Sequence, residues 1–330
     1  MRTIRDLGER EVIRTIINLL DLMPDMPIPF GDDVSAIPID GEKLLVMKVD
    51  MLVSETDVPP GMSLRQAARK AIVMNVSDFA AKGVKPLVAL TSLGLPPNLT
   101  ERDISEIGLG LSEAAKEYDL YIIGGDTNES SNLVIDCALI GFSNKRKIVR
   151  RSGARPGDIV AVTGYFGKAS SGLKVLLEGL TPPEHIREPL VEAVLMPRAR
   201  LREGLVLAEL GALTSSIDSS DGLAWSLYEL SDASNVGFLI ERVPVAPEVV
   251  GFARKYHLDP VDLSLYGGEE YELVVTVKPE LWNKAREALR GIGSDLIGIG
   301  KVTERKEVRL KVNGEYVVVE KRGWEHFRCS

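Results

Sequence analysis

Two aspartates stand three positions apart in the stretch SSIDSSDGL, residues 215–223, which also holds four serines. Asp218 and Asp221 lie where an apolar segment gives way to one with helical spacing. A turn would explain them, because Asp and Ser bond their own backbone and Gly accepts positive φ. Carboxylates in such a place could also hold a metal ion, since Mg²⁺ prefers oxygen ligands. Taken alone, the stretch favours the turn.

Five other aspartates stand at or near the ends of expected elements, beside small residues that let a ligand approach the backbone. They are Asp32 and Asp33 in GDDVSAI, Asp50 in MKVDMLV, Asp78 in NVSDFAAKG and Asp126 in IIGGDT. Each one singly is most simply a structural residue paired with Lys or Arg, because burying an unpaired charge is costly. With Asp218 and Asp221 they make seven. Seven in comparable settings predict a hard-cation site, in which Mg²⁺ is held by carboxylates and substrate phosphates.

The helices and strands expected to carry these residues follow one another along the chain in no regular order. Apolar periodicity predicts helices over residues 9–20, 63–83, 101–120, 167–180, 197–211 and 280–292. Strand-like runs cover residues 43–53, 87–95, 121–125, 133–142, 158–164 and 271–277. In the second of the helices, Asn75 and Asp78 share a face with Ala71 and Ile72 that would otherwise be buried.

A domain boundary is predicted in NKRKIVRRSGARPGD, residues 144–158, a basic and turn-rich stretch without apolar periodicity. The chain of 330 residues exceeds the usual span of a single core. We therefore expect two α+β (mixed α/β) domains, residues 1–147 and 148–330, rather than one doubly wound sheet.

The composition, 45% hydrophobic and 27% charged, is typical of a soluble globular protein. The net charge of −8 argues against a nucleic-acid partner, because phosphate backbones are held by excess Lys and Arg. Cys137 and Cys329 are far apart and form no CxxC pair, which fits a reducing cytoplasm. No run of about 18 apolar residues is present, so we expect a cytoplasmic protein without a membrane partner.

An acidic cleft can bind an anionic phosphate ligand if divalent ions bridge the carboxylates and the phosphates, as they do in phosphoryl transfer. The common phosphate-binding loops are missing. GYFGKAS, residues 164–170, lacks the first Gly of a P-loop and the Ser or Thr after Lys168, and GLGLSE lacks the final Gly of GxGxxG. The three histidines, His185, His257 and His326, stand in no recognisable catalytic motif, and we expect them to be structural or surface residues.

Eight motifs in order resemble the thiamine-monophosphate kinases, in the wider family of aminoimidazole ribonucleotide synthetase and selenophosphate synthetase. They are GDD, DMLV, NVSDFAAKG, IIGGDT, RRSGARPGD, DSSDGL, GGEEYEL and GWEHF. The resemblance implies an N-terminal domain that dimerises through its sheet, a C-terminal α/β domain and an active site between them. It also implies a homodimeric kinase that phosphorylates thiamine monophosphate to thiamine diphosphate, with ATP as co-substrate and several Mg²⁺ ions.

Site residues follow from the resemblance motif by motif. Implied metal ligands are Asp32, Asp50, Asp78, Asp126, Asp218 and Asp221, and Asp33 joins them as its neighbour in GDD. Implied nucleotide contacts are Gly125, Asp126, Arg151 and Ser220. Implied substrate contacts are Glu269, Trp324 and Asp57, the last in place of a His. No catalytic side chain is expected, because a phosphate monoester with a second pKa of about 6 needs no general base at neutral pH.

The chain departs from the family pattern at several positions. Lys48 and Val49 stand where many bacterial members have two threonines, Gly108 where a Tyr accompanies ATP, and Glu270 where Asp is usual. Alternatives also stay open. Arg151 could be a solvated charge in KRKIVRR, and Trp324 could be core packing.

Two other functions fit parts of the sequence. A carbamoyl dehydratase of hydrogenase maturation presents a C-terminal Cys, and this chain ends in Cys329-Ser330. A non-catalytic dimer could bind nucleotide and metal without turnover.

Overall fold

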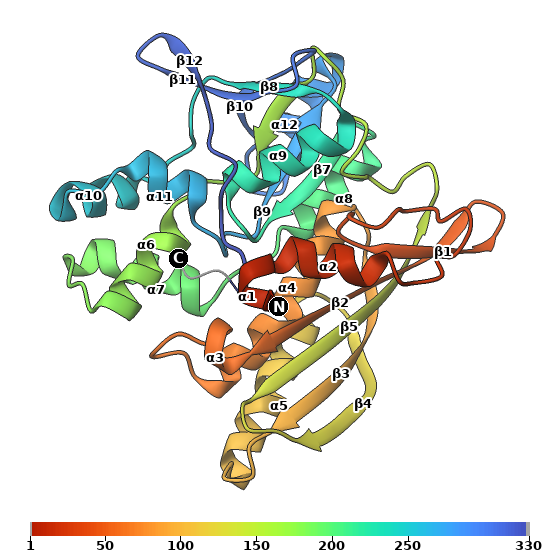
Figure 1. Cartoon of the computed structure of the whole chain (residues 1–330), viewed down its shortest axis with the longest axis vertical. Helices are drawn as coiled ribbons and strands as arrows, with labels where there is room; N and C mark the ends of the chain where they lie inside the picture. The colour runs from red at the N-terminus through yellow and green to blue at the C-terminus, as the bar shows by residue number, and fades with distance from the viewer. Residues whose placement is uncertain (1, 328–330) are drawn as a thin grey trace.

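Helix α4 (Leu64–Ala81) lies at the centre of the fold and contacts strands of two β-sheets. The computed structural model describes residues 2–327 (Figure 1). A capping box begins the helix, since the Ser63 hydroxyl accepts from the Gln66 amide and the Gln66 side chain accepts from the Ser63 amide. Gly83, at φ +63°, ends it. Of its 18 residues, 14 are buried, so this helix is enclosed on almost every side.

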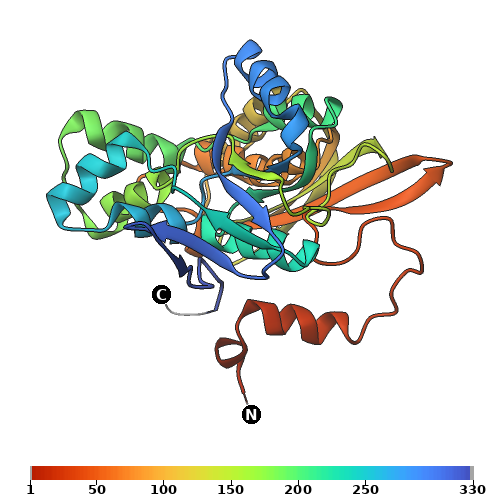
Figure 2. The same cartoon turned by 90° about the horizontal axis from the view of Figure 1, so that it is seen from above.

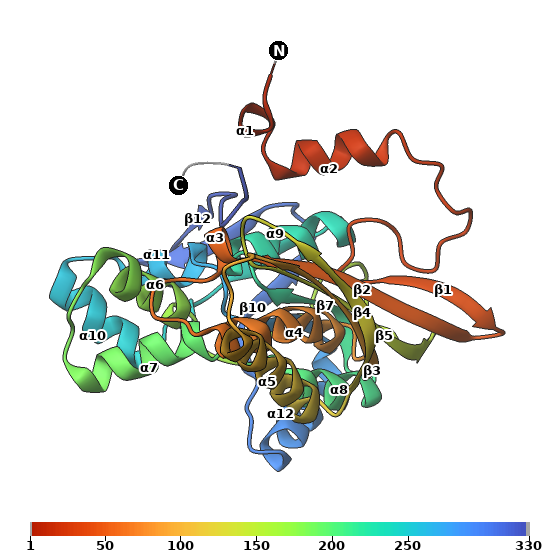
Figure 3. The same ribbon diagram turned by 90° about the horizontal axis from the view of Figure 1, so that it is seen from below.

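The first sheet has the strand order β1-β2-β5-β3-β4, with only β3 and β4 parallel. Its strands are β1 (Ser35–Asp40), β2 (Lys43–Val53), β3 (Pro86–Leu95), β4 (Tyr121–Glu129) and β5 (Val134–Asn144). Helix α4, with α5 (Glu101–Glu117) beside it, covers the inner face (Figure 3). The outer face carries exposed apolar side chains, Val49, Met51, Leu90, Tyr121 and Phe142.

Strand β1 pairs only with the first half of β2, from Lys43 to Met47. Among the described residues, the second half of β2 therefore has a strand neighbour on one side only, namely β5. Strand β4 forms the opposite edge of the sheet. Both free edges matter for the site described below.

The second sheet has the order β12-β11-β8-β10-β6-β9-β7 and is antiparallel except between β8 and β11. Its strands are β6 (Ile159–Val162), β7 (Leu213–Ser219), β8 (Gly237–Ile240), β9 (Glu272–Val277), β10 (Ile297–Thr303), β11 (Val308–Val312) and β12 (Glu315–Val318). Its helical segments are α6 (Lys168–Glu178), α7 (Glu184–Leu195), α8 (Leu201–Glu209), α9 (Leu223–Ser234), α10 (Pro247–Tyr256), α11 (Pro260–Tyr266), the 3₁₀ helix η1 (Pro279–Leu281) and α12 (Trp282–Gly291). Helices α6, α7, α10 and α11 gather to one side of this sheet (Figure 1).

The N-terminal segment stands apart from both sheets (Figure 2). It contains α1 (Ile4–Leu7) and α2 (Glu9–Ile17), and neither helix has a buried residue. Side chains tie α2 to the second domain. The Arg10 guanidinium lies 3.6 Å from the centroid of the Trp225 ring and forms an ion pair with Glu229.

The two mixed α/β domains predicted from the sequence are confirmed, and so is the strand over 43–53. Helix α7 was not expected, and α3 (Ser54–Asp57) is a single turn after β2. The first sheet ends at Asn144 and the second begins at Ile159, so the expected division after residue 147 falls between them and stays a prediction.

No helix among residues 2–327 is long and apolar enough to cross a membrane. Cys137 is buried and free, and Cys329 lies outside the described residues. A cytoplasmic location stays a prediction.

Candidate active site

A cavity of about 760 Å³ lies between the two domains and gathers much of the predicted site. Five predicted acidic residues line it, Asp50, Asp57, Asp78, Asp218 and Asp221. Arg151 and Ser220 line it as well. An adjoining hollow of about 250 Å³ shares Asp218, Ser220 and Asp221 with this cavity and adds Trp324. Sequence motifs more than 200 positions apart are therefore brought to one place.

Three buried carboxylates from separate elements converge beside the cavity. Asp33 precedes β1, Asp78 stands on α4 and Asp218 is near the end of β7. One oxygen of each lies within 4.8 Å of the other two. Asp218 is thus a strand residue rather than part of a turn, and only Asp221 lies in the connection to α9.

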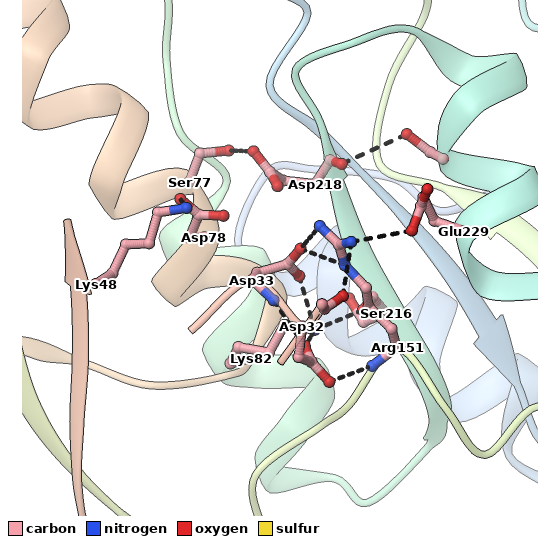
Figure 4. Close-up of polar contacts among 12 residues, drawn as sticks. Asp32, Asp33, Lys48, Ser77, Asp78, Lys82, Arg151, Ser216, Asp218 and Glu229 are labelled. Atoms are coloured by element: carbon pink, nitrogen blue, oxygen red, sulfur yellow. Dashed lines mark hydrogen bonds and ion pairs between the residues drawn. The ribbon is translucent and has the colours of Figure 1, made fainter. Parts of the chain in front are cut away.

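Two cations, Lys82 and Arg151, hold the GDD loop in place (Figure 4). The Lys82 ammonium, wholly buried, lies 2.7 Å from an oxygen of Asp32 and 2.7 Å from one of Asp33. It also donates to the Ser216 carbonyl at 2.8 Å. The Arg151 Nε donates to Asp33 at 2.7 Å, and its backbone amide donates to Asp32 at 3.0 Å. The interpretation of Arg151 as a solvated surface charge is therefore wrong.

Asp78 and Asp218 have other partners (Figure 4), and one of these partners, Lys48, also pairs with Asp50. The Lys48 ammonium lies 3.0 Å from an oxygen of Asp50 and 3.0 Å from one of Asp78. The Ser77 hydroxyl donates to Asp218 at 2.7 Å.

Mutual repulsion and burial shift the titration of these groups. Burial, reinforced by the charge of Asp33, raises the pKa of Asp218 to about 7. Burial also raises the pKa of Asp78 well above its ordinary range, although Lys48 opposes the change. Burial alone would raise the pKa of Asp33, but Lys82 and Arg151 together outweigh it and hold that pKa below its ordinary value. The positive charge around Asp78 and Asp218 is therefore too small to balance two ionised carboxylates.

Such a donor set fits a divalent cation. Hard oxygen ligands from several carboxylates suit Mg²⁺, and its charge would relieve the repulsion that raises these pKa values. A neutral oxygen is also free nearby, because the buried Asn75 Oδ1 accepts no hydrogen bond from the described residues while its Nδ2 donates to the Ala71 carbonyl.

Two of the residues predicted to face the substrate, Asp57 and Glu269, are joined through Lys70, whereas Trp324 lines the adjoining hollow. Lys70, almost fully buried on α4, donates to the Asp57 carbonyl at 2.9 Å and forms an ion pair with Glu269. The Glu269 amide donates to the Ser220 carbonyl at 2.6 Å, which ties this group to the DSSDGL turn. Trp324 is 44% exposed, so the alternative of a core tryptophan is wrong.

Gly125 and Asp126 stand apart from this arrangement. Neither lines the cavity within one chain, and Asp126 is exposed on the edge strand β4. Along the ladders, Asp50 pairs with Cys137, Cys137 with Thr91 and Thr91 with Gly125. Three strand spacings separate Asp50 from Gly125, which is about 14 Å. A side chain at Gly125 would collide with the Thr91 backbone, since an added Cβ would lie 1.7 Å from the Thr91 carbonyl oxygen.

Several residues of the site were missed from the sequence. Lys70, Ser77 and Lys82 were given no role, although the first two lie on the same helix as Asp78 and Lys82 is its C-cap. Their signal was available, because polar residues at 70, 77, 78 and 82 in an Ala-rich helix recur at helical spacing. His326, expected to be structural or on the surface, lines the cavity.

The fold and site together define an AIR synthase related protein. Residues 31–143 match the family model of the AIR synthase related protein, N-terminal domain, and residues 155–313 that of its C-terminal domain. Within this class, the chain belongs to the thiamine-monophosphate kinase family. It is 38% identical over 324 residues to the thiamine-monophosphate kinase of Pyrococcus horikoshii, covering 98% of this chain and 97% of the relative. It is 34% identical to the Bacillus subtilis enzyme of that name, covering 98% and 100%.

Solved structures agree with this assignment. The structure of AaThiL complexed with AMPPCP and TMP superposes with a TM-score of 0.86 at 30% identity, and 99% of each chain is covered. The HypE–HypF complex gives a TM-score of 0.75 at 23% identity, covering 94% of this chain and 98% of that one, which shows a shared fold alone.

Proposed function

We propose that this chain transfers the γ-phosphoryl group of ATP to thiamine monophosphate, giving thiamine diphosphate and ADP. The observation that carries the proposal is the convergence of Asp33, Asp78 and Asp218 beside a cavity between the domains. It is supported by the similarity to kinases of this name and to a structure complexed with AMPPCP and TMP. Phosphoryl transfer depends mainly on positioning and charge stabilisation, which such a site can provide.

Metal ions fit the acidic side of the cavity. Asp33, Asp78 and Asp218 are the proposed core ligands, with Asp32, Asp50 and Asp221 around them. When bound, Mg²⁺ would offset the negative charge of the two phosphates that must meet. The role of the protein is then to hold its carboxylates in place. Lys82 and Arg151 fix Asp32 and Asp33, and Ser77 orients Asp218.

No general base is needed for this reaction. The acceptor is a phosphate monoester whose second pKa is about 6, so its oxygen is largely ionised at neutral pH. The chain must instead align the acceptor oxygen with the γ-phosphate and limit access of water. His326 lines the cavity but has no required proton to carry.

Thiamine carries a permanent positive charge on its thiazolium ring, which acidic and aromatic side chains can recognise. Asp57, Glu269 and the exposed ring of Trp324 are the proposed contacts. Lys70 holds Glu269 and the Asp57 backbone in a fixed relation. A cation-π contact of this kind typically contributes about 0.5 to 2 kcal/mol.

We propose that a second copy of the chain completes the nucleotide site. The outer face of the first sheet is apolar and exposed, which favours its burial against another copy. Among the residues that the structure describes, the second half of β2 and the outer edge of β4 have no strand neighbour, so a two-fold pairing of outer faces can bring β4 of one copy beside β2 of the other. Gly125 and Asp126 of the second copy would then stand near Asp50, with Arg151 and Ser220 as the nucleotide contacts of the first.

Hybrid dimers test this arrangement. Asp126→Asn and Asp218→Asn chains, each inactive alone, are mixed, dissociated and reassembled. If Asp126 acts on the site of the other copy, the hybrid contains one intact site and activity returns. If both residues serve the same chain's site, the mixture stays inactive. Light scattering should give the dimer mass for the wild-type chain.

The function itself is tested by incubating the protein with ATP, Mg²⁺ and thiamine monophosphate. We expect equal amounts of thiamine diphosphate and ADP. Binding of ATP without either product would favour the non-catalytic dimer instead. Activity that depends on Cys329, tested with Cys329→Ser, would favour the carbamoyl dehydratase, because the kinase reaction has no use for that thiol.

A further inference from the structure

Lys48 places a positive charge inside the carboxylate cluster. It stands on β2, two positions before Asp50, and its side chain faces the inner side of the sheet and lines the cavity. The ammonium lies 3.0 Å from Asp78 Oδ2 (Figure 4). It also lies 3.0 Å from Asp50 Oδ1, and the side chain is 21% exposed. One cation therefore bridges two carboxylates from different elements, a strand and a helix.

The other cations of the site, Lys82 and Arg151, are engaged with other acceptors. Lys82 is occupied by Asp32, Asp33 and the Ser216 carbonyl. Arg151 is occupied by Asp33 and also pairs with Glu229 at 3.2 Å. Asp50 and Asp78 therefore depend on Lys48 for a charged partner among the described residues.

The residue type is informative because Lys48 brings a positive charge to a position between two carboxylates, where a neutral side chain would bring none. A threonine hydroxyl is neutral and leaves Asp50 and Asp78 with their full negative charge, which a divalent ion can balance. An ammonium between the same oxygens already balances part of that charge, and it repels a second cation placed beside it.

We propose that Lys48 is a built-in cation that takes the place of one divalent metal ion between Asp50 and Asp78. The inference rests on the proposed function, since it concerns the metal ions of that site. It predicts that this chain binds one metal ion fewer than an otherwise identical chain with a neutral residue at position 48. The remaining ions would be held by Asp33, Asp218 and their neighbours.

The test counts metal ions rather than turnover. Mn²⁺ bound per chain is measured by electron paramagnetic resonance of the free ion, with AMPPCP at saturation, for wild type, Lys48→Thr and Lys48→Gln. We expect one additional Mn²⁺ in each variant. Lys85→Thr is the matched control, because Lys85 pairs with Asp119 on the surface and its loss should leave the count unchanged. Circular dichroism establishes that each variant is folded, and the Gln variant, which keeps most of the side-chain length, serves if the Thr variant does not fold.

Equal Mn²⁺ counts in wild type and a folded Lys48 variant would overturn the proposal. If the count is unchanged but AMPPCP binds ten-fold more weakly or worse, Lys48 is a phosphate contact and the proposal is also wrong. The Mn²⁺ count tests the role of Lys48, and the product assay tests the proposed function, so the two can fail independently. A chain that makes thiamine diphosphate with equal counts refutes only the role of Lys48, whereas a chain with different counts and no product refutes only the kinase activity.

Discussion

Replacing Lys82 by methionine should strongly destabilise the protein and make its stability depend on Mg²⁺. The Lys82 side chain is wholly buried, and so is that of Asp33, while that of Asp32 is 4% exposed. Methionine fills a similar volume but leaves two buried carboxylates with only Arg151 as a cation. Removing one partner of a buried ion pair costs about 3 to 5 kcal/mol, because the other charge stays buried without compensation.

Differential scanning calorimetry measures the effect. For a chain of 330 residues the loss corresponds to a fall in Tm of roughly 4 to 7 °C in chelator. Adding Mg²⁺ should restore more Tm in Lys82→Met than in wild type, since a divalent ion can replace the missing charge beside Asp33. Lys85→Met is the control three positions away. Lys85 and its partner Asp119 are exposed, so its removal should change stability by less than about 1 kcal/mol.

The reasoning is refuted if Lys82→Met melts within about 2 °C of wild type in chelator, or if Mg²⁺ raises both melting points equally. Either result would mean that Asp32 and Asp33 do not depend on Lys82 for charge compensation. It would also weaken the view that the GDD loop is fixed before metal binds.

Three further predictions follow from individual side chains. Asp218→Asn should lower turnover by roughly 10²-fold or more at saturating Mg²⁺ while the protein stays folded, as steady-state kinetics and circular dichroism would establish; near-normal turnover would exclude an essential ligand. Trp324→Ala should raise KM for thiamine monophosphate by roughly 5- to 30-fold and leave KM for ATP unchanged, with partial recovery in Trp324→Phe. An unchanged KM in a folded Ala variant would remove this ring from the substrate site. Burial raises the pKa of Glu270 from its ordinary value of 4.5 to about 8. The neutral carboxyl therefore contributes its full stability below pH 4.5, and this contribution is lost as the pH rises through about 8. Melting curves of wild type and Glu270→Gln should therefore separate in favour of Gln as the pH is raised, and parallel curves would contradict the shift.

The sequence predicted the two mixed α/β domains and several of their helices and strands, β2 and α4 among them, but not α7. Asp78 was placed correctly because a carboxylate on an Ala-rich helical face needs a specific partner, and β2 was found because its apolar run has clear ends. What periodicity cannot provide is the identity of that partner. Lys48 reaches Asp78 from 30 positions away, as the numbering shows, and the contact depends on how β2 and α4 pack.

Asp126 illustrates a different limit. The order of the motifs assigned Asp126 to the metal site together with Asp50. Within one chain, however, Asp50 lies on β2 and Asp126 on β4, which are at opposite ends of the sheet if the short β1 is left out. Motifs along a chain do not reveal whether their residues meet within that chain or across an interface. The strand order shows that Asp126 and Asp50 are apart within one chain. Whether they meet across an interface can be measured only on the assembled molecule.

Helix α4 and helix α2 divide the molecule into a rigid part and a movable part. Fourteen residues of α4 are buried and none of α2 are. Opening of α4 would require both sheets to separate, so its free energy approaches that of global unfolding, whereas α2 can detach at the cost of a few side-chain contacts. Asp78 on α4 is therefore held by the more enclosed of the two helices. Glu9 and Ile13 of α2 both line the cavity, so detachment of α2 would widen the opening of that cavity. The timescale of turnover can thus be set by the N-terminal helix while α4 stays in place.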